Sequence, residues 1–427
     1  MDYFSYRESA GGRQLFAEDV ALSELAERFG TPCYVYSSAA LVGRFDAFSR
    51  AVGDALLCYS VKANDNLAVI RCLGGAGAGA DIVSGGELRR ALAAGIAPAK
   101  IVFAGVGKTG DEMADALDAG IARFNVESED ELELLAALAA ARGLRAPVAL
   151  RVNPDVDAKT HDKISTGRAQ DKFGIEFDRA GALYALGAGL DGIAMDGLAI
   201  HIGSQLTSLK PFADAFARLG ELCRSLRQNG QTVSRLDLGG GLGISHDGKA
   251  PLDLHLYGDL VRCTGRELET RLTLEPGRWM VGPAGLLLAR VIRVKQNGNK
   301  QFVIVDMAMN DFLRPALYGA EHDIQAVMPR PGDTAPVDIV GPICESGDVI
   351  AAERSMPELR AGDLIAVRDA GAYGAVMSSS YNSRPPAAEA MVRGEDAALI
   401  RPRLDYEALL ARDSVPDWLS ASDGGSQ

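Results

Sequence analysis

The sequence predicts an α/β protein in which a closed (β/α)8 barrel of the TIM type is joined to a second, mostly β domain. Eight short β-rich runs follow one another between Leu57 and Glu275, and a segment long enough for a helix separates each run from the next. This alternation is typical of parallel strands that close into a barrel. After about residue 284 the pattern changes to β-rich runs joined by turn signals, which indicates the second domain.

The strands of the barrel are predicted at residues 57–61, 79–83, 100–104, 122–126, 147–152, 196–201, 234–238 and 271–275. Between the sixth and seventh strands, apolar residues recur at intervals of three and four from Phe212 to Leu226, directly after Pro211. This spacing predicts a helix with one face buried on the barrel. The pair Asn229-Gly230 is expected to end that helix.

The second domain is predicted from β-rich runs at residues 286–294, 302–306, 336–340, 363–368 and 371–377. Asn297-Gly298 is a strong hairpin signal between the first two runs. An early run, Cys33–Tyr36, is a strand that the barrel does not need, so we assign it to the second domain. The predicted limits are 39–283 for the barrel and 1–38 plus 284–427 for the β-rich domain, which we expect to complete the active site.

Composition narrows the class of ligand. The 427 residues carry a net charge of −13 and contain no block of Lys and Arg, which argues against nucleic acid and favours a small-molecule substrate. No run of 18 apolar residues and no signal-peptide pattern occurs, so we expect neither membrane insertion nor export. The six cysteines are singly spaced, which favours reduced thiols in a cytoplasmic protein.

Polar residues follow four of the predicted barrel strands, at the end where such barrels carry their reactive groups. They are Lys62, the run His201–Ser204, the glycines Gly239, Gly240 and Gly241, and the run Glu275-Pro276-Gly277-Arg278. A lysine at a strand end can simply point into water, which is the ordinary place for lysine. At the mouth of a barrel it can instead form a Schiff base with a carbonyl compound.

Three successive glycines between a strand and a helix allow backbone N–H groups to approach a phosphate, although they also fit a plain tight turn. Together with Lys62 and a carboxylate on the same rim, they predict a pyridoxal 5'-phosphate (PLP) site. Lys62 would bind the aldehyde, and Glu275 would keep the pyridine nitrogen protonated so that the ring can accept electrons. We predict no metal site.

The motifs Tyr59–Asn64, His201–Gln205, the three glycines and Glu275–Arg278 resemble, in order and spacing, those of the alanine-racemase-fold (fold type III) PLP-dependent decarboxylases. The resemblance implies that His201 stacks on the cofactor ring, whereas a lone histidine would suggest a core residue. It also implies that Ser204, the glycines and residues 275–278 hold the phosphate and ring, and that two subunits share each site. Asp81, Ser84–Glu87 and Asn153 fit the same pattern, and we expect them to pack around the site.

The second domain carries motifs that resemble the branch of this family acting on diaminopimelate. They are Phe312–Pro315, Tyr318, Gly341–Asp348 and Ala370–Gly374. The resemblance implies that Cys344 returns a proton to the substrate carbanion, although a lone cysteine after a strand is more often a small buried hydrophobe. It also implies that Tyr373 contacts phosphate and substrate from the neighbouring subunit.

The distal end of diaminopimelate has an ammonium and a carboxylate, so its recognition needs an anion and a cation. Glu345 can supply the anion, and Arg278 and Arg314, with Tyr318, can supply the cation. The alternative for the two arginines is a role in surface salt bridges. Tyr373 is expected to join them. The implied reaction is PLP-dependent decarboxylation of meso-2,6-diaminopimelate to L-lysine and CO2, the last step of lysine biosynthesis, in a cytoplasmic homodimer.

Three alternatives remain at this point. A sibling decarboxylase acting on ornithine, arginine or carboxynorspermidine would share the cofactor residues, but Glu345 and Arg314 argue against it. A non-catalytic PLP-binding relative would lack the lysine or the proton donor, and a racemase would need a tyrosine base in place of the cysteine loop. Separately, the polar segment Asp157–Gly174 predicts a lid over the cofactor because of its length and its glycines.

Overall fold

The structure is a computed structural model that describes residues 3–9, 12–157, 166–167, 171–245 and 251–419. Most of the predicted lid, namely residues 158–165 and 168–170, lies outside the described residues. In the part of the chain that is described, no helix is both long enough and apolar enough to cross a membrane.

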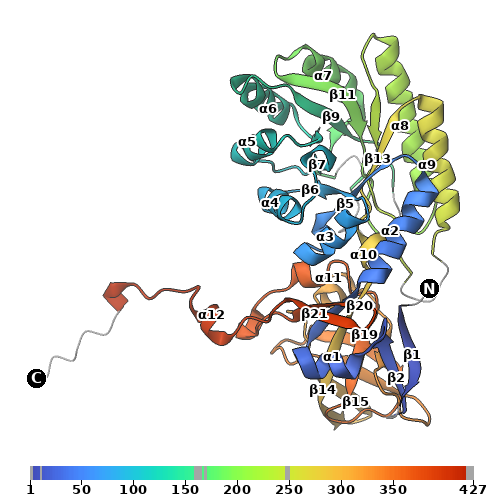
Figure 1. Cartoon of the computed structure of the whole chain (residues 1–427), viewed down its shortest axis with the longest axis vertical. Helices are drawn as coiled ribbons and strands as arrows, with labels where there is room; N and C mark the ends of the chain where they lie inside the picture. The colour runs from blue at the N-terminus through green and yellow to red at the C-terminus, as the bar shows by residue number, and fades with distance from the viewer. Residues whose placement is uncertain (1–2, 10–11, 158–165, 168–170, 246–250, 420–427) are drawn as a thin grey trace, which may run out of the picture.

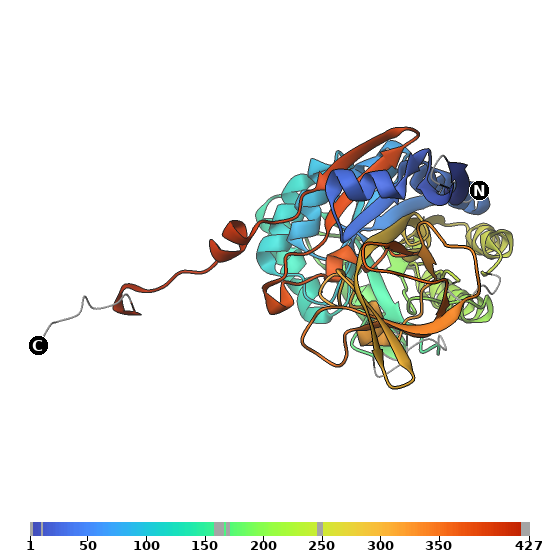
Figure 2. The same ribbon diagram turned by 90° about the horizontal axis from the view of Figure 1, so that it is seen from below.

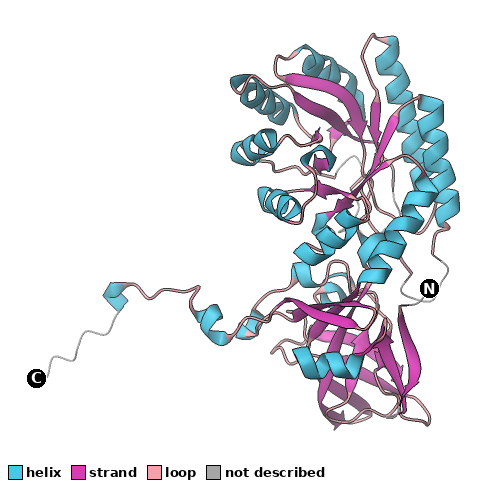
Figure 3. Cartoon of the chain, viewed as in Figure 1, coloured by secondary structure: helices cyan, strands magenta, loops and turns pink. Residues whose placement is uncertain are grey.

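The predicted barrel is confirmed. Its strands pair in parallel in the order of the sequence, and β13 pairs with β5 through Thr273 with Leu56 and Leu274 with Leu57, which closes the cylinder. Figures 1 and 3 show these strands inside a ring of helices. The eight strands found among the described residues are β5 (Leu56–Ser60), β6 (Gly79–Ile82), β7 (Ile101–Phe103), β8 (Arg123–Val126), β9 (Ala146–Asn153), β11 (Ile193–Ala199), β12 (Arg235–Asp237) and β13 (Arg271–Leu274). A short strand, β10 (Ile175–Glu176), pairs with the end of β9.

Among the described residues, six of the eight helices around the barrel begin at a residue whose side chain caps the helix, and the helices at Phe177–Gly189 and Lys210–Gln228 do not. Ser84, Thr109 and Ser128 each accept a hydrogen bond from the N–H three residues ahead, and Thr109 with Glu112 forms a full capping box. The ring consists of α2 (Ser38–Val52), α3 (Leu67–Gly75), α4 (Gly85–Ala93), α5 (Gly110–Ala119), α6 (Glu129–Ala141), α7 (Phe177–Gly189), α8 (Lys210–Gln228) and α9 (Leu254–Leu268). The helix predicted after Pro211 is α8, and Gly230 follows its end with a φ of +79°.

The second domain is built on a large, mostly antiparallel sheet. Its main path is β18–β17–β15–β14–β4–β20–β21, with β19 bridging β14 and β16. The strands are β4 (Cys33–Ser37), β14 (Gly285–Asn297), β15 (Lys300–Val305), β16 (Ile324–Ala326), β17 (Ala335–Val340), β18 (Val349–Met356), β19 (Leu364–Val367), β20 (Ala388–Arg393) and β21 (Asp396–Arg401). The assignment of the early strand is confirmed, since β4 pairs with β14 and β20. The hairpin at Asn297-Gly298 joins β14 to β15, as predicted.

The predicted strand at residues 371–377 is wrong. This segment is a turn followed by a 3-10 helix, Ala375–Met377, and Tyr373 has a φ of +55°. A Cβ atom on Gly371 would lie 1.9 Å from the carbonyl oxygen of Val281, at the end of the short helix α10 (Arg278–Val281). The chain therefore crosses α10 too closely to run as a strand.

The first thirty residues add elements that the sequence analysis does not predict. They are β1 (Phe4–Ser9), β2 (Gly12–Ala17), β3 (Val20–Ala21) and α1 (Leu22–Phe29). Their apolar side chains, among them Phe4 and Leu15, share a core with Leu286, Leu288 and Val392 of the β-rich domain. This packing agrees with grouping residues 1–38 with 284–427, and the domain limits themselves stay a prediction.

The chain ends in a projecting segment, residues 404–419, which we name the C-terminal arm. It contains α12 (Tyr406–Leu410) and a 3-10 turn (Asp417–Leu419), and it extends away from the rest of the chain in both views (Figures 1 and 2). Six of its apolar side chains are exposed: Leu404, Tyr406, Leu410, Val415, Trp418 and Leu419. The arm therefore presents apolar surface that its own chain does not cover.

Candidate active site

Lys62 lies directly after β5, in a 3-10 turn formed by Val61–Ala63. Its Nζ donates a hydrogen bond to Oδ2 of Asp81 at 2.5 Å, and Asp81 is fully buried at the end of β6. Burial opposes the charge, but the carboxylates of Asp81 and Glu275 raise the pKa of Lys62 above its usual value. Because the side chain is only one-third exposed, Lys62 does not simply leave the strand for water.

Glu275 follows β13, the strand beside β5, and is almost completely buried. Asn125 donates to Oε1 of Glu275 at 3.2 Å and to Oδ2 of Asp237 at 3.1 Å, so one amide links the two carboxyl groups. Burial and the carboxylates of Asp237 and Asp81 raise the pKa of Glu275 well above its usual value. Glu275 can therefore hold a proton at neutral pH.

Three residues that the sequence analysis did not assign to the site connect these groups. Ser60 lies 2.8 Å from Asp81 Oδ2 and 2.9 Å from the carbonyl oxygen of Glu275, and Asn125 and Asp237 complete the network. Each is a polar residue in an otherwise apolar part of a barrel strand, and each is buried. That pattern could have identified them, because a polar side chain inside a barrel needs a partner there.

His201 lies just past β11 and contacts the glycine turn. Its Nδ1 accepts a hydrogen bond from the N–H of Gly240 at 3.1 Å, so the proton of the neutral ring is on Nε2. Burial, with Arg151 and Lys62 nearby, lowers the pKa of His201 well below its usual value. The ring is therefore an uncharged flat surface beside Lys62.

The glycine turn at residues 239–241 requires glycine. Gly239 and Gly241 have φ values of +68° and +101°, and a Cβ atom on Gly240 would lie 2.1 Å from the carbonyl oxygen of Glu275. The N–H of Gly239 donates to Asp237 Oδ1, and that of Gly240 to His201. Two of the three N–H groups expected to face a phosphate are thus engaged within the protein, because the turn is packed between two strand ends.

Ser204 and Arg278 meet on the same rim. The guanidinium group of Arg278 donates to Oγ of Ser204 at 3.1 and 3.3 Å and lies 4.6 Å from the centre of the Tyr373 ring. Pro276 anchors this rim, since its carbonyl oxygen accepts from the N–H of Ser60 at 3.1 Å. Gly277 is closely packed, because a Cβ atom there would lie 3.0 Å from Cβ of Ser60.

Tyr373 contradicts one prediction. Its N–H donates to the carbonyl oxygen of Ala63 at 2.8 Å, next to Lys62 of the same chain. The expectation that Tyr373 comes from the neighbouring subunit is therefore wrong. The reason is the turn at residues 370–374, which returns from the β-rich domain to its own barrel through hydrogen bonds to Gly282 and Gly285.

Arg314 begins the short helix α11 (Arg314–Tyr318) and is 5% exposed. Burial and the nearby charge of Arg278 lower the pKa of Arg314 to about 10, and its guanidinium carbon lies 5.8 Å from the centre of the Tyr318 ring. Nη1 of Arg314 is buried without a hydrogen-bond partner among the described residues. Both candidate arginines are thus buried near each other, and neither forms a surface salt bridge with another described residue.

The Cys344–Glu345 loop lies on the outside of the β-rich domain. Cys344 is exposed, its N–H donates to Asn382 at 2.9 Å, and Tyr381 donates its hydroxyl hydrogen to Glu345 at 2.8 Å. Cys344 is therefore not the small buried hydrophobe that a lone cysteine after a strand would suggest. Among the described residues, no hydrogen bond or ion pair joins this loop to Lys62.

The side chains at the barrel mouth fit PLP. Lys62 offers the amine for an aldehyde, and Glu275 a buried acid for a ring nitrogen. His201 offers a neutral ring, while Ser204, Arg278 and Tyr373 are hydrogen-bond donors for a phosphate. This combination defines a class of protein, the PLP-dependent decarboxylases built on a barrel. The family described as "Pyridoxal-dependent decarboxylase, pyridoxal binding domain" matches residues 38–282, which is more than half of the chain.

Two further comparisons narrow the class. Diaminopimelate decarboxylase of Pseudomonas aeruginosa is 52% identical over 420 residues, covering 97% of this chain and 99% of the relative. The crystal structure of diaminopimelate decarboxylase from M. jannaschii with L-lysine has a TM-score of 0.92 at 35% identity and covers 98% of this chain and 100% of that chain. The H. pylori enzyme with L-lysine has a TM-score of 0.88 at 38% identity, covering 92% and 98%. The chain belongs to the diaminopimelate decarboxylase family, which confirms the resemblance, the fold class and the PLP cofactor.

Proposed function

We propose that this protein removes one carboxylate from meso-2,6-diaminopimelate and releases L-lysine and CO2, as the last step of lysine biosynthesis in the cytoplasm. The observation that carries the proposal is the pair of buried arginines, Arg278 and Arg314, of which Arg278 contacts Ser204 and the ring of Tyr373. A substrate whose distal end bears a carboxylate gives this pair of cations a partner.

Lys62, His201, Ser204, the glycine turn, Glu275–Arg278 and Tyr373 would hold PLP. When bound, PLP supplies an electron-withdrawing ring that accepts the electron pair left by the departing carboxylate. Burial and the nearby carboxylates of Asp237 and Asp81 raise the pKa of Glu275, so its carboxyl group can share a proton with a ring nitrogen.

Lys62 must lose a proton before its Nζ can attack a carbonyl carbon. Oδ2 of Asp81, at 2.5 Å, is the acceptor that lies closest to that proton. The same ion pair would hold the free amine of Lys62 at the strand end.

The distal end of the substrate would be bound by groups of opposite charge. Arg278 and Arg314 face the carboxylate with Tyr318 beside them, and Nη1 of Arg314 is buried and available for that contact. Glu345 is the anion for the distal ammonium, and Tyr381 orients its carboxylate.

Cys344 would return a proton from Sγ to the α carbon after CO2 leaves, and solvent then restores the thiol. Because Cys344 and Glu345 are exposed and, among the described residues, no hydrogen bond or ion pair joins them to their own Lys62, we propose a homodimer in which this loop enters the partner's site. The exposed apolar side chains of the C-terminal arm support a second copy on the same side, since α12 lies beside the turn at Ser380–Ser383 that holds the loop.

Two alternatives are less favoured. Ornithine has no distal carboxylate, so an ornithine decarboxylase would leave a buried arginine pair without a ligand. A non-catalytic PLP-binding relative would have no use for a lysine paired with Asp81 and an exposed cysteine in an anchored loop.

The test is incubation of the PLP-loaded protein with meso-diaminopimelate, ornithine, arginine or carboxynorspermidine, with detection of CO2 and of the amine product. We expect CO2 and L-lysine from meso-diaminopimelate alone. Faster release of CO2 from any of the other three substrates would overturn the proposal.

A further inference from the structure

We infer that His322 is a positioning residue for substrate binding, because it fixes the guanidinium group of Arg314 toward the distal carboxylate. The inference rests on the proposed function and deepens it. His322 belongs to no motif used above. It is 3% exposed, and its ring nitrogens contact Arg314 and the carbonyl oxygen of Arg368.

The hydrogen bonds of His322 determine its tautomer. Nε of Arg314 lies 3.2 Å from Nε2 of His322, and the arginine nitrogen can only donate, so Nε2 must accept. Nδ1 lies 2.9 Å from the carbonyl oxygen of Arg368, which can only accept, so Nδ1 carries the proton. His322 is thus a neutral imidazole whose lone pair points at Arg314.

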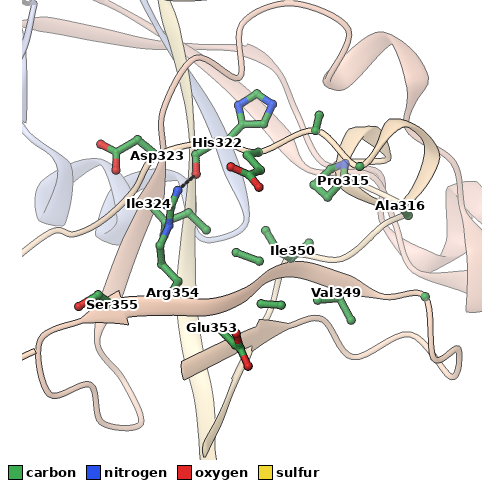
Figure 4. A pocket seen from close by; sticks show the side chains of 16 residues that line it. Pro315, Ala316, His322, Asp323, Ile324, Val349, Ile350, Glu353, Arg354 and Ser355 are labelled. Atoms are coloured by element: carbon green, nitrogen blue, oxygen red, sulfur yellow. Dashed lines mark hydrogen bonds between the residues drawn. The ribbon is translucent and has the colours of Figure 1, made fainter. Parts of the chain in front are cut away.

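The imidazole packs against an aromatic ring, and the main chain of His322 is held separately. Phe312 packs edge-on against the ring, with centroids 4.8 Å apart and an angle of 76° between the planes. Arg354 of β18 donates to the main-chain carbonyl of His322, and Figure 4 shows this contact at the wall of the cavity between α11 and β18. The ring is therefore a fixed acceptor, which does not follow Arg314 when the guanidinium moves.

Arg314 has terminal nitrogens that the contact with His322 leaves for a ligand. His322 occupies Nε, whereas Nη1 is buried without a partner among the described residues. An arginine held at Nε keeps its two terminal nitrogens for a bidentate contact with a carboxylate. Because Arg278 lies close by and opposes the charge of Arg314, a neutral acceptor is needed to hold the second guanidinium in place.

Two substitutions separate the positioning role from a structural one. Gln can place an amide oxygen near the position of Nε2, so His322→Gln keeps an acceptor for Arg314. Asn can place an amide nitrogen near Nδ1, so His322→Asn keeps the bond to the Arg368 carbonyl and loses the acceptor. The two variants are matched, since each removes one hydrogen bond of the same ring.

The measurements are kcat and KM for meso-diaminopimelate, and inhibition by L-lysine and by cadaverine, which lacks the distal carboxylate. For His322→Asn we expect KM and the inhibition constant of L-lysine to rise about tenfold, with kcat and the inhibition constant of cadaverine changed less than about twofold. For His322→Gln we expect values within about threefold of the parent protein. Equal effects of the two variants, or equal weakening of L-lysine and cadaverine, would overturn the inference.

A double-mutant cycle covers the case in which either variant folds poorly. In an Arg314→Lys background the His322 acceptor has lost its guanidinium partner, so adding His322→Asn should weaken L-lysine binding by less than about twofold more. A further tenfold loss would contradict the positioning role. If the parent protein forms no L-lysine from meso-diaminopimelate, the proposed function fails and the inference falls with it; if L-lysine forms and the variants do not differ, only the inference fails.

Discussion

The barrel mouth and the Cys344–Glu345 loop differ in how far one chain completes them. At the mouth, Lys62 forms an ion pair with the buried Asp81, and the buried carboxyl group of Glu275 accepts a hydrogen bond from Asn125. The loop carries a thiol that is exposed, and it is bonded to the turn at Tyr381 and Asn382 of its own chain. The groups that need a fixed electrostatic environment are thus built within one chain, whereas the group that delivers a proton is presented outward.

The largest effect is expected at the mouth. Lys62→Ala should abolish both turnover and the visible absorption of bound PLP, because the amine that attaches the cofactor is removed. The measurements are lysine formation and an absorption spectrum after gel filtration. Lys100→Ala is the control, since Lys100 precedes β7 at the opposite end of the barrel and should leave both unchanged. Retained turnover in Lys62→Ala would contradict the assignment.

Cys344→Ala should lower turnover by roughly 10²–10⁴-fold with PLP still bound, since a proton donor is lost and the mouth is intact. The comparison becomes sharper when Cys344→Ala and Lys62→Ala subunits are mixed. If the loop serves the partner, half of the dimers are mixed and each has one intact site, so about a quarter of the parent activity should return. No return of activity would mean that loop and lysine serve the same chain.

Removal of the C-terminal arm should weaken the proposed dimer without altering the mouth. A chain ending at Arg403 loses the exposed apolar side chains of the arm, and we expect the dimer dissociation constant to rise roughly tenfold or more. Analytical ultracentrifugation and activity at increasing protein concentration would show it. Ile292→Ser, at an exposed apolar position of β14, is the control and should leave the dimer intact. An unchanged dimer would show that the arm has another partner.

The smallest effect concerns stability of the PLP-free protein. Because the pKa of Glu275 is raised on folding, the native state holds its proton to higher pH than the unfolded chain, and the free energy of unfolding falls as pH rises from about 4.3. Glu275→Gln lacks this fall in the free energy of unfolding. Between pH 6 and pH 9, the melting temperature of the variant relative to that of the parent protein should therefore rise by roughly 2–4 °C.

Glu112→Gln is the matched control for Glu275→Gln. Hydrogen bonds from the N–H groups of Gly85 and Thr109 lower the pKa of Glu112, so its contribution is present above its unfolded pKa and is lost toward acid. We therefore expect this variant to be slightly less stable than the parent at neutral pH. Equal behaviour of the two variants in thermal melts would contradict the assignment of a buried, protonated Glu275.

Much of the fold could be predicted because it depends on local periodicity. The eight strands, α8 with its terminal glycine and the hairpin at Asn297-Gly298 each follow from a few consecutive residues. The strand predicted at 371–377 failed for a tertiary reason, since Gly371 packs against the end of α10 and Ala372 is buried.

The residues of the site also fall into those that the local sequence predicts and those that only the fold brings together. Lys62, His201 and Glu275 could be found because each follows a strand, and strand ends meet at one rim. Asn125 and Asp237 could not be paired from sequence, since their contact joins residues 112 positions apart. His322 could not be identified from the sequence either, because its role depends on its contact with Arg314. Only the fold brings the guanidinium group of Arg314 to Nε2 of His322.

The hydrogen bond from Tyr373 to Ala63 also limits how a substrate can enter. It ties the β-rich domain to the residue after Lys62, while the bonds from Ala370 and Gly371 clamp the same turn to the start of β14. A hinge motion that separated the two domains of one chain would also displace Lys62. We therefore expect substrate entry and product release to depend on movements at the partner-facing side, while the interior of each chain stays rigid.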